Sequence, residues 1–314
     1  MIEAKELTKR YGETVAINEV SFKVSKGEVV GFLGPNGAGK TTTMKILTGY
    51  MPPDKGTALI NDMVVQEKPV QVKQCIGYLP EDNPLYEDMG VYDYLSFIAD
   101  IRAIDKQEKT RRITEMIEVC GLQRVVSKDI YELSKGYRQR LGLAQTLIHS
   151  PDILILDEPT AGLDPNQIIE IRNLIREIGK QKTTILCTHI LSEVQATCNR
   201  SIIINEGRIV AQGTPEEISQ RARGNQVIYI TVRGRQEALQ EELTKLPQVL
   251  SAKHLRALEP DRHRFVLSAA TEKDINEDIF IWAKDNDHIL SEIHAESSFE
   301  KAFMKLTMGE NKDA

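Results

Sequence analysis

The residues best suited to chemistry form a glycine-rich run that ends in a lysine and a threonine. The run matches GxxxxGK[ST] and consists of Gly34, Pro35, Asn36, Gly37, Ala38, Gly39, Lys40 and Thr41. Backbone N–H groups of such a loop surround β- and γ-phosphates, Lys40 adds a point charge, and Thr41 offers a hydroxyl to Mg²⁺. The alternative is a glycine-rich turn without a ligand. A strand pattern at residues 28–33 and a helical pattern at residues 43–48 favour the phosphate loop, which predicts binding of ATP or GTP.

Two adjacent acids, Asp157 and Glu158, follow an apolar strand pattern at residues 153–156. They lie at the end of the strand where nucleotides bind in α/β sheets. Because consecutive strand residues project in opposite directions, we expect Asp157 to face Mg²⁺ and Glu158 to face an attacking water as its base. An isolated pair of acids is more often a solvated strand end, and the phosphate loop upstream is what favours catalysis here.

A third segment, residues 133–140, opens a helical pattern. Ser134 is suited to cap that helix, and Gly136 permits close approach of an anion to the free N–H groups. This predicts a second anion site. By itself, the segment would more often be only a capped helix.

The elements that must position these residues indicate an α/β P-loop NTPase core. Apolar strand patterns without polar alternation, at residues 28–33, 153–156 and 183–187, predict a parallel sheet buried on both faces. Helical patterns such as residues 168–178 alternate with them. Residues 91–149 show helical spacing alone and predict a helical subdomain. A hairpin is predicted at residues 201–211, followed by a helix that starts at residues 214–217.

A second domain is predicted after Gly224, because only Gly234 and Gly309 of the 20 glycines lie beyond it. With a linker at residues 219–225, the domains are 1–223 and 226–314. Strand patterns at residues 227–232, 249–254, 265–268 and 289–294 alternate with helical patterns at 236–246 and 272–284. The order βαββαβ predicts a small ferredoxin-like α+β domain, closed by a helix at 297–306. Its role stays open between a structural extension that widens a dimer contact and a ligand sensor.

The composition narrows the class of protein. With 314 residues, 41% hydrophobic and 27% charged, the chain suits two globular domains and excludes disorder or a disulfide scaffold. The four cysteines contain no CxxC pair, which argues against a zinc site. A net charge of −6 argues against nonspecific nucleic-acid binding by the whole surface and leaves a local basic patch open, so no nucleic-acid partner is expected. No apolar stretch approaches the roughly 20 residues of a membrane span, and no secretory signal is present, so we expect a cytoplasmic protein.

Five motifs, in this order and spacing, resemble those of the ATP-binding subunit of an ATP-binding cassette (ABC) transporter over residues 2–220. They are Walker A at 34–42, a signature at 133–137, Walker B at 153–158, a D-loop at 161–164 and a switch histidine at 189. The resemblance implies that Thr42 also binds ATP, that His189 contacts the γ-phosphate, and that Tyr11, expected before the first strand pair, stacks on adenine. Without it, Tyr11 would be interpreted as a surface tyrosine and His189 as a packed strand-end residue.

The chain departs from the family's commonest motifs at two places. Lys135 and Tyr137 replace a glycine and the glutamine of the LSGGQ signature, although Ser134 and Gly136 are kept. At the Q-loop, Glu81 stands where the family usually has glutamine, which would put an acid near the metal and the attacking water. These features and the segment 298–303 resemble a bacterial exporter branch that includes subunits associated with gliding motility.

The resemblance also implies partners. Each chain has one Walker A and one signature, and in the family these meet across ATP only when two subunits face each other. A homodimer, or a pair with another ABC subunit, would therefore bury two nucleotides. A separate transmembrane permease would dock beside residues 81–90 and hold the chain at the inner face of the membrane. Hydrolysis would drive transport, and the branch implies export.

Two other function classes explain less of the sequence. One is a soluble ABC ATPase that acts on nucleic acid or ribosomes. DNA-repair members separate Walker A from the signature by hundreds of residues, and ribosome-acting members usually carry two cassettes, whereas this chain has one compact cassette. The other, a P-loop GTPase or small-molecule kinase, would not explain the signature, the D-loop and His189.

Overall fold

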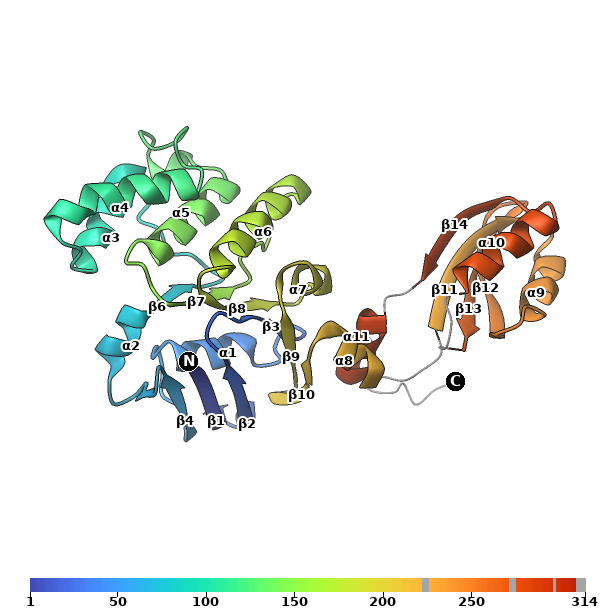
Figure 1. The fold of residues 1–314 in the computed structure, drawn as a ribbon, viewed down its shortest axis with the longest axis horizontal. Helices are drawn as coiled ribbons and strands as arrows, with labels where there is room; N and C mark the ends of the chain where they lie inside the picture. The colour runs from blue at the N-terminus through green and yellow to red at the C-terminus, as the bar shows by residue number, and fades with distance from the viewer. Residues whose placement is uncertain (222–225, 271–274, 296–297, 309–314) are drawn as a thin grey trace. The chain divides into compact units, whose positions relative to one another are not determined.

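The computed structural model describes residues 1–221, 226–270, 275–295 and 298–308 (Figure 1). It contains two compact units, Met1–Thr214 and Pro215–Ala314. Part of the predicted linker, residues 222–225, lies outside the described residues. Helix α8 (Pro215–Arg221), expected before the linker, groups with the second unit, and the predicted domain limits stay predictions. Among the helices of the described ranges, none combines the length and hydrophobicity that a membrane crossing requires.

A six-stranded sheet forms the centre of the first unit. Its order is β10-β9-β3-β8-β7-β6; the strands from β9 to β6 run parallel, and β10 pairs antiparallel at one edge. The strands are β3 (Val29–Leu33), β6 (Ile76–Leu79), β7 (Ile153–Asp157), β8 (Thr183–Thr188), β9 (Arg200–Asn205) and β10 (Arg208–Gly213). The predicted parallel sheet and the predicted hairpin are confirmed.

Successive residues of the central strands point into two different hydrophobic cores. Ile153 and Ile155 join a core with α1 (Lys40–Leu47), whereas Leu154 and Leu156 join another with α5 (Lys135–Leu147) and α6 (Pro165–Gly179). Figure 1 shows α1 on one side of the sheet and α5 and α6 on the other. Each such side chain stabilises the fold by about 1.5–3 kcal/mol when fully buried. Burial on both faces is why these strands lack polar alternation.

Within residues 91–149, where a helical subdomain is predicted, the structure has helices and turns and none of the strands of the two sheets. The segment comprises α3 (Val91–Ile101), α4 (Lys106–Val119), a 3₁₀ turn η1 (Ile130–Glu132) and α5. The start of α4 follows local capping chemistry: the Asp105 side chain accepts a hydrogen bond from the N–H of Gln107, 2.8 Å away. Two short helices were not predicted, α2 (Pro69–Cys75) and α7 (Leu191–Thr197).

A separate antiparallel sheet in the first unit was also missed by the sequence analysis. It has the order β2-β1-β4-β5 and consists of β1 (Ile2–Tyr11), β2 (Thr14–Val24), β4 (Lys55–Ile60) and β5 (Met63–Val64). A usable signal was present, because Val20, Phe22 and Val24 are buried and alternate with exposed polar residues. This sheet adds its buried face to the core that contains α1.

The second unit has its own core and the predicted element order βαββαβ. The elements are β11 (Gln226–Arg233), α9 (Gln236–Thr244), β12 (Val249–Glu259), β13 (Arg262–Ala269), α10 (Asn276–Asp285) and β14 (Leu290–Ala295). The antiparallel sheet has the order β12-β13-β11-β14, and Phe265, Leu267 and Trp282 contribute to the apolar cluster between sheet and helices. Helix α11 (Ser298–Met308) packs against α8 in the same unit. Residues 272–274 and 297 of the predicted helices lie outside the described residues.

Candidate active site

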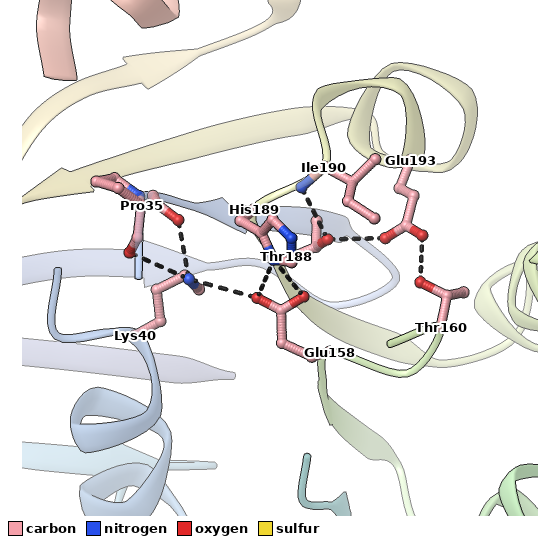
Figure 2. Close-up of polar contacts among 9 residues, drawn as sticks. Pro35, Lys40, Glu158, Thr160, Thr188, His189, Ile190 and Glu193 are labelled. Atoms are coloured by element: carbon pink, nitrogen blue, oxygen red, sulfur yellow. Dashed lines mark hydrogen bonds and ion pairs between the residues drawn. The ribbon is translucent and has the colours of Figure 1, made fainter. Parts of the chain in front are cut away.

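Three segments with predicted chemistry leave the six-stranded sheet at the same edge. In the parallel pairs of β8 with its two neighbours, Leu33 lies opposite Thr188 and Asp157 lies opposite Cys187. The phosphate loop follows Leu33, Glu158 follows Asp157, and His189 follows Thr188. Strand register therefore brings together residues that are far apart in the sequence, and Figure 2 shows the contacts that result.

The loop between β3 and α1 requires glycine for two physical reasons. Gly37 and Gly39 have φ angles of 80° and 106°, which residues with side chains rarely adopt. A Cβ atom on Gly34 would lie 2.4 Å from the carbonyl oxygen of Ile204, so a side chain does not fit there. Ala38 of the predicted loop is buried. The remaining predicted residues are half-buried or exposed: Pro35, Asn36, Thr41 and Thr42. The loop thus presents its backbone at the start of a helix, where N–H groups favour anions.

The side chain of Lys40 is buried among oxygen atoms. Its Nζ donates to the carbonyl oxygens of Gly34 at 2.8 Å and Pro35 at 3.3 Å, and it lies 3.4 Å from Oε1 of Glu158. On the other side of that carboxylate, Nδ1 of His189 lies 3.0 Å from both Oε1 and Oε2. The side chains of Lys40 and Glu158 are each 6% exposed, whereas that of His189 is 46% exposed. The Glu158 carboxylate is therefore held between a buried cation and a ring that reaches solvent.

The direction of the Glu158 side chain has a different origin from the one expected. We expected strand alternation to separate Asp157 from Glu158, but β7 ends at Asp157. Glu158 has a φ of 48°, in the left-handed region, and its N–H donates to the carbonyl oxygen of Cys187 at 2.9 Å. Backbone strain of this kind costs about 1–3 kcal/mol and is held in place by surrounding structure. A strained turn, rather than the pleat of a strand, aims Glu158 at Lys40 and His189.

Asp157 has the properties expected of a metal ligand. It is fully buried, and neither of its carboxylate oxygens has a hydrogen-bond partner of ordinary geometry among the described residues. Burial raises the pKa of Asp157, and the negative charges of Glu158 and Glu81 raise it further. The hydroxyl of Thr41 and the ammonium of Lys40 act in the opposite direction. Because an unpaired buried carboxylate is costly, these oxygens fit a Mg²⁺ ion.

Tyr11 is not before the first strand pair, as the resemblance had suggested, but within it. It is the last residue of β1 and pairs with Thr14 of β2 across their hairpin. Its ring is largely exposed, and its hydroxyl donates to Sδ of Met51 at 3.1 Å. An exposed ring on a rigid hairpin could still offer a stacking surface, and adenine contact stays a prediction.

The signature residues lie away from the phosphate loop. Ser134 caps α5, as predicted, by accepting a hydrogen bond from the N–H of Tyr137 at 3.4 Å. A Cβ atom on Gly136 would lie 2.6 Å from the end of the Gln167 side chain, which would have to move to admit it. Helices α5 and α1 join different cores on opposite faces of the sheet, and the described residues show no hydrogen bond or ion pair between Ser134 or Gly136 and Lys40.

Comparison with known proteins assigns the family. The ABC transporter family model matches residues 17–161. The linearmycin resistance ATP-binding protein LnrL of Bacillus subtilis is 34% identical over 79% of this chain and 80% of its own length. The Nod factor export ATP-binding protein I of Cupriavidus pinatubonensis is 30% identical over 100% of this chain and 92% of its own length. The chain belongs to the ATP-binding subunits of ABC transporters.

A solved structure supports the same assignment. The cbiO1 protein of Clostridium perfringens, part of the ABC transporter complex cbiONQ, shares 31% identity with a TM-score of 0.64. The match covers 69% of this chain and 89% of that protein. The predicted fold class, an ABC ATPase core of the P-loop kind, is therefore confirmed, and the chain is an ATP-binding ATPase.

Within this ABC subunit, the negative charge of Glu81, the unusual acid at the Q-loop, acts on the pKa of Asp157. Glu81 is exposed in the loop that follows β6, the strand next to β7. In the register of these two strands Leu79 lies opposite Leu156, so Glu81, two residues after Leu79, comes near Asp157. Burial is the main cause that raises the pKa of Asp157, and the negative charge of Glu81 raises it further. Glu81 thus adds negative charge near Asp157, and its place near a metal stays a prediction.

Sequence reasoning missed three polar residues beside the site. Glu193 is a buried acid on α7, and the hydroxyls of Thr160 and Thr188 both donate to its carboxylate. Figure 2 shows this group next to Glu158 and His189. The only signal in the sequence was position, since Thr160 and Thr188 adjoin the D-loop and the switch histidine.

Proposed function

We propose that this chain hydrolyses ATP to drive a separate membrane permease, in the direction of export. The observation that carries the proposal is the buried contact chain Lys40–Glu158–His189 beside the unpaired carboxylate of Asp157. It combines a cation for phosphate, a base held in place and a ligand for a divalent ion. The names of LnrL and of the Nod factor export protein support export, since one confers resistance and the other serves export.

The chemistry of hydrolysis follows from these side chains. Lys40 and the N–H groups of residues 34–42 would bind the β- and γ-phosphates, for which the Lys40 ammonium is already desolvated. Glu158 would accept a proton from the attacking water, and His189 would hold the carboxylate and contact the γ-phosphate. Thr41 and Asp157, with Glu81 nearby, would hold Mg²⁺, which would neutralise phosphate charge. Tyr11 would stack on the adenine ring.

A dimer would complete each site. The placement of α5, which carries Ser134 and Gly136, on the face of the sheet opposite α1 supports a signature that comes from a second subunit to meet ATP held by Lys40. In a two-fold homodimer, or in a similar pair with another ABC subunit, each of the two nucleotides meets the signature of the opposite subunit. The capped start of α5 would then offer its N–H groups to the γ-phosphate of the partner's nucleotide.

The permease would dock beside residues 81–90. Tyr86 in this segment is largely exposed, and its ring packs edge-on against Phe97 of α3, with centroids 5.6 Å apart. Glu87 forms an ion pair with Arg138 of α5, which joins the proposed docking segment to the signature helix. Movement imposed by a permease could therefore reach the signature. This arrangement would keep the chain on the cytoplasmic face of the membrane.

The permease prediction is tested by purification in mild detergent. We expect the full-length chain to recover one multi-span membrane protein that stimulates its ATPase activity, and Tyr86→Ser to lose both effects because the exposed anchor is gone. Tyr131→Ser removes an equally exposed tyrosine on η1 and serves as the matched control. Recovery of RNA or ribosomes with no membrane protein would instead favour a soluble ABC ATPase.

For residues 226–314 we propose a ferredoxin-like domain that acts as a structural extension. The βαββαβ order and the interleaved sheet order β12-β13-β11-β14 support this topology. The separate core of this unit supports its independence. A relative that aligns over 100% of this chain carries a counterpart of the whole region.

Truncation tests the independence of the two units. A chain that ends at Thr214 should melt cooperatively and bind Mg-ATP as the full-length chain does, because the residues of its two hydrophobic cores all belong to the first unit. A chain that ends at Arg223 is the matched comparison. It keeps α8 without α11, exposes the buried Ile218 and should aggregate more readily. Loss of cooperative melting in the Thr214 chain would mean that the two units share a core, whereas weaker dimerisation alone would support the structural extension.

A further inference from the structure

A buried carboxylate lies next to the proposed catalytic residues without belonging to the motifs. Glu193, on α7, is 1% exposed. Its Oε1 accepts a hydrogen bond from the hydroxyl of Thr160, and its Oε2 accepts one from the hydroxyl of Thr188 at 2.8 Å. Both threonines are buried as well. Within the described part of the chain, the side-chain partners of Glu193 are therefore hydroxyls rather than a cation.

The two partners of Glu193 belong to the two segments that carry the proposed chemistry. Thr188 ends β8 and directly precedes His189, and its oxygen also accepts the N–H of Ile190 at 3.1 Å. Thr160 comes two residues after Glu158 and directly precedes the D-loop. The turn between Glu158 and the D-loop is closed by the Ala161 N–H, which donates to the Glu158 carbonyl oxygen at 3.1 Å. One carboxylate thus connects both segments (Figure 2).

The chemistry of these bonds favours a role beyond packing. A buried carboxylate without a cation is costly, and an apolar side chain of similar size would fill the same space without that cost. What an apolar residue would not supply is two charge-assisted hydrogen bonds that fix hydroxyls on both of its sides. Such fixation is needed here, because Glu158 has a left-handed φ of 48° and the His189 ring is half-exposed.

We propose that Glu193 is a positioning residue, which sets the distance between His189 and Glu158 by holding Thr188 and Thr160 on its two carboxylate oxygens. This inference rests on the roles proposed above for Glu158 and His189. Glu193 does not contact either of them directly. Its effect is on alignment, and a misplacement of about 1 Å can reduce a rate by about 10²-fold.

The test changes the hydroxyls of Thr160 and Thr188 in one set of variants and the carboxylate of Glu193 in another. Thr160→Val and Thr188→Val keep the shape of the side chain and lose the donor, so we expect kcat for ATP hydrolysis by the full-length chain to fall about 10- to 100-fold, the range for one hydrogen bond to a charged group. KM for ATP should stay within about twofold, because phosphate binding is not touched. Thr160→Ser and Thr188→Ser keep the hydroxyl and should restore kcat. Glu193→Gln should lower kcat similarly, and the Glu193→Gln/Thr160→Val pair should cost less than the product of the single losses.

A matched control is available on the same helix. The hydroxyl of Thr197 on α7 is buried and has no hydrogen-bond partner in the described structure, so Thr197→Val should leave kcat unchanged. If the valine variants lower the melting temperature but keep the wild-type kcat, Glu193 is only structural and the proposal is overturned. If Glu193→Gln does not fold, comparison of kcat between the valine and serine variants of Thr160 and Thr188 still tests the positioning role. Wild-type hydrolysis by Glu158→Gln would defeat the proposed function itself, whereas an inactive Glu158→Gln with fully active valine variants would defeat the positioning role alone.

Discussion

Glu158→Gln is expected to reduce ATP hydrolysis by about 10²- to 10⁴-fold, the range for loss of a general base. The amide keeps the size of the side chain and its contact with His189, but it does not accept a proton from water. ATP binding should persist because Lys40 and the phosphate loop are unchanged. The variant should therefore accumulate as an ATP-bound dimer, measured by size-exclusion chromatography with Mg-ATP alongside steady-state ATPase rates.

The chain provides its own control for that experiment. Glu81→Gln makes the same chemical change on an exposed loop residue that lies near the same site. It should cost much less than Glu158→Gln, because Glu81 is not held by Lys40 and His189. If both variants lose hydrolysis equally and still bind Mg-ATP, the assignment of Glu158 as the base is wrong. A Glu158→Gln protein that stays monomeric in every nucleotide condition would count against the dimer.

Lys40→Ala should weaken Mg-ATP binding by about 10- to 100-fold or more, because it removes a charge-assisted hydrogen bond from a buried site. The effect is on affinity rather than on the proton transfer, which sets it apart from Glu158→Gln. The change also leaves the buried Glu158 without its cation, so the free energy of unfolding should fall as well. Calorimetric titration with Mg-ATP and thermal melting measure the two effects.

Lys45→Ala is the matched control for the loss of one lysine from α1. Lys45 lies in the last turn of the helix, with its ammonium 5.6 Å from the ring centre of Tyr50, and it has no contact with Glu158. Its variant should bind Mg-ATP as the wild type does. If the Lys40 and Lys45 variants bind equally well, the Lys40 ammonium does not contact phosphate.

The parts of this site that could be predicted from sequence are those whose geometry is local. The phosphate loop is encoded by glycines at φ angles of 80° and 106° and by a strand and a helix that adjoin it. The cap of α5 was predicted for the same reason, since Ser134 bonds a residue three positions later. The parallel sheet was predicted because burial on both faces leaves runs of apolar residues such as 153–156.

Tertiary structure alone decided how those local pieces meet. The sequence places Asp157 and Glu158 side by side, but their directions depend on a left-handed turn that the Cys187 carbonyl helps to hold. The face on which Ser134 lies depends on which core α5 joins. Glu193 lies on a helix of seven residues, too short for a clear apolar period. Its bonds span 33 residues to Thr160 and five to Thr188. Motif spacing encodes backbone conformation within a few residues. The contacts that bring Glu158 to His189, and Glu193 to its two threonines, depend instead on strand register, which forms only when the whole sheet is assembled.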